Sequence, residues 1–241
     1  MNVSGVHGVI VDIEGTTSST ESVHVGLYDF ARPRLEPWLR EHGDDPVVRD
    51  AIHATITDAG LDDATTIDVA EVLLGWMDGD VKATPLKTVQ GQIWAAGFAD
   101  GELTPHFFDD VAPALDEWRR AGIELAVFSS GSVAVQRPWF AHGLPDAVAE
   151  GFSAYFDTVN AGNKREPGSY VTIADDLTAR WGCEPSELLF LSDVTAELDA
   201  AAGAGWQTIG IRRFGEPNAN VDFGEHRVAA DFASIEVETN R

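Results

Sequence analysis

The apolar and polar positions divide the chain into regions with different periodicities. Residues 6–12 form a short apolar run without polar alternation, which predicts a buried strand. After about residue 105, segments with strand-like and helix-like patterns alternate. Strands are expected at 124–130, 154–161, 188–194 and 207–213, and helices at 111–122, 132–143, 168–182 and 195–205. This alternation predicts an α/β fold, in which helices cover both faces of a parallel sheet.

Residues 21–100 follow a helical pattern instead. Apolar residues recur there every three or four positions, as in Val69, Leu73 and Trp76, and glycines, prolines and acidic turns separate the segments. Because this stretch follows the first strand, we expect it to be a helical insert in the α/β fold. The segment after about residue 215 is polar, and its pattern favours no particular element.

Acidic and hydroxyl side chains follow the predicted strands at the points where they end. Asp12 and Glu14 follow the first strand, Ser129 and Ser130 end the strand at 124–130, and Asp193 follows the apolar run LLFLS. The carboxyl ends of parallel strands lie at one edge of a sheet, where such folds bind ligands. The acidic pair alone could cap a turn, but a third acid at a second strand end favours a functional site.

These residue types suit phosphoryl transfer assisted by a metal ion. Mg²⁺ prefers oxygen ligands, takes one or two carboxylates from the protein and keeps positions for water and phosphate. The hydroxyls and backbone N–H groups of SSGS, residues 129–132, could hold phosphate oxygens, and Lys164 would add a positive charge. One carboxylate could then attack phosphorus, while the other donates a proton to the leaving oxygen.

Composition excludes several other classes of partner. The chain has 40 acidic residues against 16 Lys and Arg, a net charge of −24, so nucleic acid and anionic membrane surfaces are not expected to bind. We find no pattern typical of a signal peptide or a membrane span. Cys183 is the only cysteine, which excludes an internal disulfide and suits a cytoplasmic protein.

Four motifs together resemble a known superfamily. DIEGT at 12–16, SSGS at 129–132, Lys164 and SDVTAE at 192–197 are similar to the motifs of the haloacid dehalogenase-like phosphatases. That superfamily usually has Asp where this chain has Glu14. Residues 89–111, VQGQIWAAGFADGELTPHFFDDV, narrow the resemblance to the enolase-phosphatases of methionine salvage, also called acireductone synthases.

The resemblance implies a fold, an activity and a cofactor. The fold would be a Rossmann-like core of residues 1–18 and 103–241, with a helical cap at 19–102 inserted after the first strand. The substrate would be a small-molecule phosphate, 2,3-diketo-5-methylthiopentyl-1-phosphate, which is first enolised and then dephosphorylated. Mg²⁺ would be the only cofactor, and we expect the chain to act as a monomer.

The resemblance also implies residue roles. Asp12 would be the nucleophile and a metal ligand, and Asp193 would complete the metal site. Glu14 would be the general acid/base and the third residue of the metal site, and by proximity it is a candidate base for enolisation. Ser129 and Ser130 would bind the phosphate or the diketone oxygens. Lys164 would bind the phosphate.

Three alternatives stay open. They are a phosphatase of the same fold with another small phosphate ester, a phospho-receiver domain, and a dehalogenase. A receiver needs an acceptor Asp where this chain has FSSGS, and a dehalogenase does not need the metal. Glu197 and Asp199 are interpreted as first-turn residues of a helix. Cys183 is interpreted as structural, and His106 could approach the site.

Overall fold

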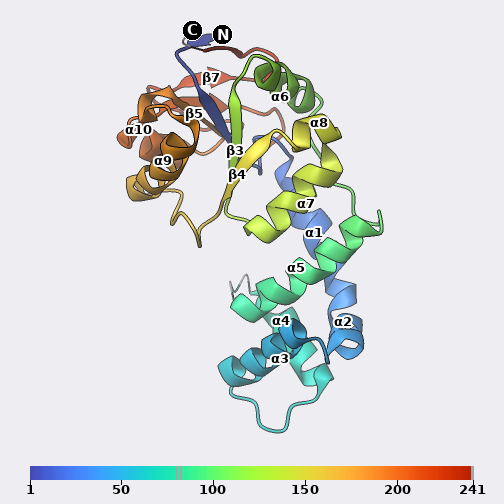
Figure 1. The fold of residues 1–241 in the computed structure, drawn as a ribbon. Helices are drawn as coiled ribbons and strands as arrows, with labels where there is room; N and C mark the ends of the chain where they lie inside the picture. Colours follow the sequence, from blue (N-terminus) through green and yellow to red (C-terminus); the bar gives the residue numbers. More distant parts are fainter. Residues whose placement is uncertain (80, 82, 240–241) are drawn as a thin grey trace. The chain divides into compact units, whose positions relative to one another are not determined.

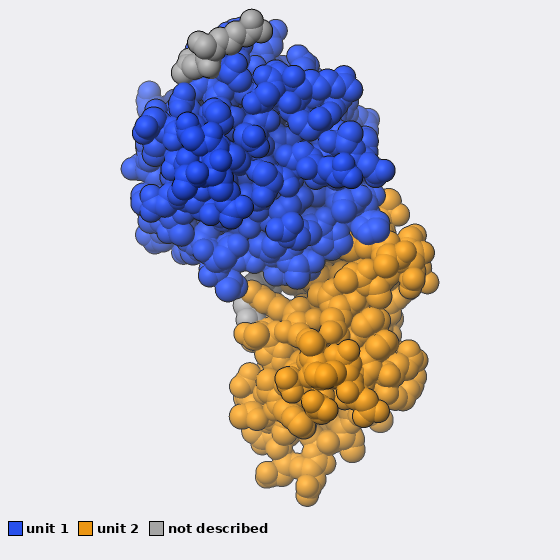
Figure 2. All heavy atoms as spheres, in the orientation of Figure 1, with its two compact units in different colours: residues 1–23, 105–241 blue, residues 24–104 orange. Residues whose placement is uncertain are grey.

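The computed structural model describes residues 1–79, 81 and 83–239, and it divides into two compact units (Figures 1 and 2). Unit 1 comprises Met1–Val23 and Pro105–Arg241, and unit 2 comprises His24–Thr104. The sequence placed these divisions at 18/19 and 102/103. Unit 1 therefore contains all six residues predicted to form the site, and unit 2 contains the helical insert.

Unit 1 is built on a parallel sheet with the strand order β4-β3-β2-β5-β6-β7. Its strands are β2 (Gly8–Val11), β3 (Glu124–Phe128), β4 (Phe152–Phe156), β5 (Leu188–Ser192), β6 (Gln207–Ile211) and β7 (Arg227–Ala229). All neighbouring strands run parallel. The predicted parallel sheet is confirmed. Strand β2 lies at its centre, between β3, which Ser129 follows, and β5, which Asp193 follows.

Helices cover both faces of this sheet (Figure 1). They are α6 (Val111–Arg120), α7 (Val133–Gly143), α8 (Asp146–Ala149), α9 (Pro167–Trp181) and α10 (Thr195–Gly203), with a 3₁₀ turn at Pro185–Glu187. Helices α9 and α10 lie on one face, and α6, α7 and α8 lie on the other. Because both faces are covered, β2 and β5 are buried along their whole length, which explains their unbroken apolar sequences.

The core beneath α9 connects directly to the predicted site. Tyr170 is fully buried, and its ring packs against Phe128, Phe190 and Trp206 at centroid distances of 5.3–5.4 Å. Its hydroxyl donates a hydrogen bond to the carbonyl oxygen of Lys164 at 2.9 Å. Aromatic packing in the core thus fixes the backbone of the loop that carries the lysine.

The chain beyond residue 215 contributes two short strands. One is β7, at the edge of the main sheet, and the other is β8 (Glu236–Glu238), which pairs in parallel with β1 (Asn2–Ser4). Each has three residues, too few to show a periodic pattern. The Val6 N–H donates to the Glu238 carbonyl at 3.1 Å, so this pairing ties the C-terminal segment to the chain just before β2.

The described residues of unit 2 form helices, as the sequence predicts. A π-helical turn at Ser22–Gly26 begins in the last two residues of the first segment of unit 1. It leads into α1 (Leu27–Ala31), a 3₁₀ turn at Arg32–Arg34, α2 (Leu35–His42), α3 (Pro46–Ala59), α4 (Thr66–Asp78) and α5 (Thr84–Ala99). Thr65 and Asp68 form a capping box that starts α4, and Gly60 in the left-handed region ends α3. In the described part of the chain, no helix is long and apolar enough to cross a membrane.

Candidate active site

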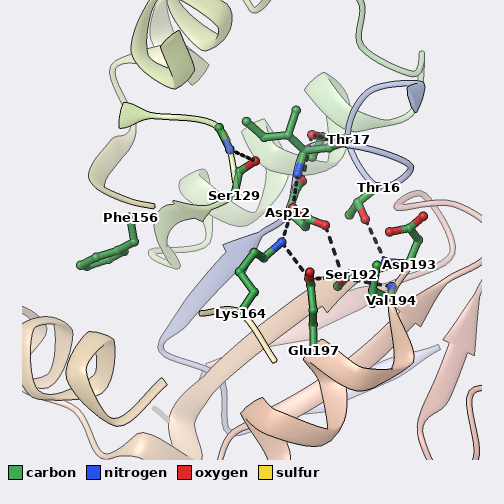
Figure 3. Close-up of polar contacts among 12 residues, drawn as sticks. Asp12, Thr16, Thr17, Ser129, Phe156, Lys164, Ser192, Asp193, Val194 and Glu197 are labelled. Atoms are coloured by element: carbon green, nitrogen blue, oxygen red, sulfur yellow. Dashed lines mark hydrogen bonds and ion pairs between the residues drawn. The ribbon is translucent and has the colours of Figure 1, made fainter. Parts of the chain in front are cut away.

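Side chains from three adjacent strand ends and one loop converge at the carboxyl edge of the sheet (Figure 3). Asp12 follows β2, Ser129 follows β3 and Asp193 follows β5. Lys164 comes from the loop before α9. Asp12, Ser129, Lys164 and Asp193 are each 5% exposed or less, so this is a polar cluster inside the protein and not a solvated surface.

Lys164 forms ion pairs with the buried carboxylates of the site. Its Nζ lies 2.6 Å from Asp12 Oδ1 and 2.7 Å from Glu197 Oε2 (Figure 3). Asp12 Oδ1 also accepts a hydrogen bond from the backbone N–H of Ile13 at 2.8 Å. The Ser192 hydroxyl lies 2.9 Å from Glu197 Oε2 and 3.4 Å from Asp12 Oδ2. Oδ1 of Asp12 therefore accepts from two donors, Lys164 and the Ile13 N–H, whereas Oδ2 has the longer contact with the Ser192 hydroxyl.

The charges of this cluster do not balance. Burial alone would lower the pKa of Lys164, but the carboxylates of Asp12 and Glu197 raise it above its ordinary value, so the lysine stays a cation. Burial raises the pKa of Asp12 well above its usual range; Lys164 opposes this rise, and the charges of Glu197 and Asp193 add to it. Burial also raises the pKa of Asp193, to about 6. The raised pKa values of Asp12 and Asp193 mean that one lysine does not supply enough positive charge for three ionised carboxylates, and a further cation would supply it.

The turn after Asp12 is shaped to pack against Asp193. The backbone N–H groups of Thr16, Thr17 and Ser18 all lie within hydrogen-bonding distance of the Ile13 carbonyl. Gly15 has a φ of +67°, and a Cβ at this position would clash with the Asp193 carboxylate. The Thr16 hydroxyl accepts a hydrogen bond from the Asp193 N–H at 3.0 Å. The glycine and threonine of DIEGTT thus hold two strand ends together.

Glu14 lies in the same turn, half-buried and bridged to Ser18. The charges of Glu197 and Asp193 both act on Asp12. Within the described part of the chain, no three His, Cys, Asp or Glu side chains are grouped so that they could hold a metal. The structure therefore brings Asp12 and Asp193 together as a pair, and the role of Glu14 stays a prediction.

The two predicted serines differ in their surroundings. Ser129 is buried, and its hydroxyl lies 3.4 Å from the backbone N–H of Gly131, whereas Ser130 is exposed. Gln136, a buried residue of α7, donates hydrogen bonds to the carbonyl oxygens of Gly131 at 2.6 Å and Phe156 at 2.8 Å. Gln136 fixes the shape of the SSGS loop, a role that no motif in the sequence indicates.

Glu197 is the main correction to the sequence-based interpretation. It lies in the first turn of α10, as expected, but its side chain is buried and paired with Lys164, so it is not only a helix-terminus residue. Its position four residues after Asp193 places both acids at the same end of α10. Asp199 pairs with His226 at 3.0 Å, and Cys183 lies in the hydrophobic core.

His106 contacts the chain near the site. Its Nδ1 accepts a hydrogen bond from the backbone N–H of Ser19 at 3.2 Å. His106 therefore holds the segment that follows the DIEGTT turn.

A second ion pair, between the buried Arg213 and the half-buried Asp110, supports the DIEGTT turn. Arg213 Nη1 donates to both carboxylate oxygens of Asp110, at 2.7 and 2.9 Å, and its Nε donates to the Thr16 carbonyl at 3.0 Å. Burial alone would raise the pKa of Asp110, but the hydrogen bonds from Arg213 and from the Phe232 N–H lower it below its ordinary value. Arg213 thus links the Thr16 backbone to the start of α6.

Comparison with known proteins places this chain in a family. A model of the haloacid dehalogenase-like hydrolases matches residues 6–205. The enolase-phosphatase E1 of Saccharopolyspora erythraea is 54% identical over 95% of both chains. The enolase-phosphatase E1 of Frankia alni is 49% identical over 95% of this chain and 94% of that one. The chain therefore belongs to the haloacid dehalogenase-like hydrolases and, within them, to the family of the enolase-phosphatases E1.

A solved structure shares the fold of this chain. The crystal structure of the UTR4 protein of Saccharomyces cerevisiae matches with a TM-score of 0.78 and 26% sequence identity. The match covers 95% of this chain and 100% of that one.

We predict that Lys164→Met destabilises the protein strongly when no metal is present. The change leaves Asp12 and Glu197 buried without their counter-charge, which typically costs about 3–5 kcal/mol. Urea unfolding of the full chain in EDTA measures this cost. Lys87→Met removes an exposed lysine and should change the free energy of unfolding by less than about 0.5 kcal/mol. Equal stabilities of the two variants would contradict the ion-pair account.

We predict a pH-dependent loss for Asp110→Asn. The folded-state pKa of Asp110 is lowered, so its pair with Arg213 stabilises the fold above about pH 4 and loses this effect as the pH falls further. At pH 7 the variant should lose about 2–3 kcal/mol, because Arg213 stays buried without its partner. Urea unfolding at a series of pH values should show that the difference in free energy of unfolding between the variant and wild type becomes smaller as the pH falls below about 4. The control is Asp109→Asn, which changes the exposed neighbouring residue and should leave the free energy of unfolding equal to that of wild type.

Proposed function

We propose that this protein is an Mg²⁺-dependent enolase-phosphatase of methionine salvage. It enolises 2,3-diketo-5-methylthiopentyl-1-phosphate and then hydrolyses the phosphate ester to give acireductone. Family membership over nearly the whole chain supports the substrate. The observation that carries the chemistry is the buried cluster in which Lys164 binds Asp12 and Glu197 beside Asp193.

The carboxylate pair fits the proposed metal. Asp12 and Asp193 offer buried oxygen ligands, and their mutual repulsion contributes to the raised pKa of Asp12. Mg²⁺ takes one or two carboxylates from a protein, so this pair meets its requirement. When bound, Mg²⁺ supplies Lewis acidity, which polarises a substrate carbonyl for enolisation and offsets the charge of the phosphoryl group.

The phosphatase step is assigned to Asp12 and Glu14. Lys164 and the Ile13 N–H hold Asp12 Oδ1 in place, and we assign the attack on phosphorus to the Asp12 carboxylate. As this bond forms, the bond from phosphorus to the substrate oxygen breaks, and Glu14 donates a proton to that oxygen. Water, losing its proton to Glu14, then displaces Asp12 from phosphorus and releases inorganic phosphate.

The other residues are assigned to binding. Lys164, Ser129 and Ser130, with the backbone N–H groups of the SSGS loop, hold the phosphate oxygens. Glu14 is the candidate base for enolisation. Unit 2 is assigned the role of a cap that excludes water during the reaction. The cytoplasmic location and the monomeric state stay predictions.

We expect the protein, incubated anaerobically with Mg²⁺ and 2,3-diketo-5-methylthiopentyl-1-phosphate, to release phosphate and produce the ultraviolet absorbance of the enol together. EDTA should abolish phosphate release, and Asp12→Asn should reduce it by more than about 10³-fold, because the attacking oxygen is replaced by an amide. Phosphate release that survives Asp12→Asn would exclude Asp12 as the nucleophile.

The same assay distinguishes the enolase-phosphatase from a phosphatase of the same fold that acts on another substrate. Metal-dependent hydrolysis of a generic aryl phosphate, without turnover of the diketone, would favour a phosphatase for another small phosphate ester. The relatives are named as phosphatases, which favours a phosphatase over the phospho-receiver and dehalogenase alternatives.

A further inference from the structure

The segment that follows β6, residues 213–218, makes three contacts with the candidate site. Besides Arg213, which donates to the Thr16 carbonyl, Glu216 Oε2 accepts a hydrogen bond from the Thr20 N–H at 2.9 Å. At the end of the segment, Asn218 Nδ2 donates to Asp193 Oδ2 at 3.0 Å. The segment therefore contacts both strand ends that carry the carboxylate pair.

The backbone of the segment is itself held in turns, so Asn218 approaches Asp193 from a folded support. The Glu216 N–H donates to the Arg213 carbonyl at 3.3 Å, and the Ala219 N–H donates to the Glu216 carbonyl at 3.0 Å. The Asn218 carbonyl accepts a hydrogen bond from the Val221 N–H at 3.2 Å. The position of the Asn218 amide is thus set by its own segment.

The two oxygens of Asp193 have different surroundings. Oδ2 accepts the hydrogen bond from Asn218 and lies against Gly15, where no Cβ could be accommodated. A carboxylate rotates easily about its terminal torsion, so a donor on one oxygen determines where the other oxygen points. An amide donor carries no charge, and it orients Asp193 without neutralising it. The oxygen left to a cation is Oδ1.

We propose that Asn218 is a positioning residue for the cation site: its amide holds Asp193 Oδ2 and so directs Oδ1 to the metal. This inference rests on the proposed function, because it takes Asp193 to be a ligand of Mg²⁺. Hydrogen-bond partners of metal ligands typically change metal affinity or activity by about 10–100-fold when they are removed. Asn218 belongs to no motif that the sequence analysis singled out.

The test is the affinity of the full chain for Mg²⁺, measured by isothermal titration calorimetry with MgCl₂. We expect Asn218→Ala to raise the Kd for Mg²⁺ by about 10–100-fold. Phosphate release should show a raised KM for Mg²⁺ with kcat nearly retained at saturating Mg²⁺. The matched control is Asn220→Ala, which removes an exposed asparagine of the same loop and should bind as wild type does.

Two further measurements separate the ways in which the inference could fail. The melting temperature in EDTA reports on folding alone, so a lower value for Asn218→Ala with an unchanged Kd would mean a purely structural role and overturn the proposal. Asp193→Asn tests the metal site itself. If Asp193→Asn binds Mg²⁺ as wild type does, the proposed metal site is wrong; if it loses binding while Asn218→Ala does not, only the inference about Asn218 is wrong.

Discussion

The candidate site depends on the burial of one cation among carboxylates. Lys164 is buried with Asp12 and Glu197 on its ammonium group, so neither acid could remain ionised at low cost without it. When ionised, Asp193 adds a third negative charge, and this charge contributes to the raised pKa of Asp12. This excess of negative charge supports the proposal that a divalent cation binds here, and such a cation would in turn allow an anionic phosphoryl group to approach in a protein with a net charge of −24.

The fold supplies the rigidity that such a cluster needs. The parallel sheet brings the ends of β2, β3 and β5 together, and the aromatic packing around Tyr170 fixes the loop of Lys164. Gly15 lets the DIEGTT turn approach Asp193, while the segment at 213–218 holds that turn and Asp193 from the other side. Hydrogen bonds from Lys164 and Ile13 hold Asp12, and one from Asn218 holds Asp193, so the acids keep their positions although they repel one another.

Much of the fold could be predicted because fully buried strands leave a clear signal. The runs that form β2 and β5 are continuously apolar, and the acids Asp12 and Asp193 end them abruptly. Strands β7 and β8 gave no such signal, because each has three residues and is exposed in part. Glu197 and Asn218 were missed for another reason. Their roles depend on partners brought together only by folding, and neither residue type is unusual in its local sequence.

The central claim is that Asp12 attacks phosphorus, and the most direct test is to look for the phosphoryl group on that side chain. The enzyme would be mixed with substrate and Mg²⁺, quenched with acid within one turnover, digested and analysed by mass spectrometry. The account predicts a phosphoryl group on the peptide that contains Asp12, located at Asp12 by fragmentation. A phosphoryl group on another residue would contradict it, as would single-turnover product formation without any phosphorylated peptide.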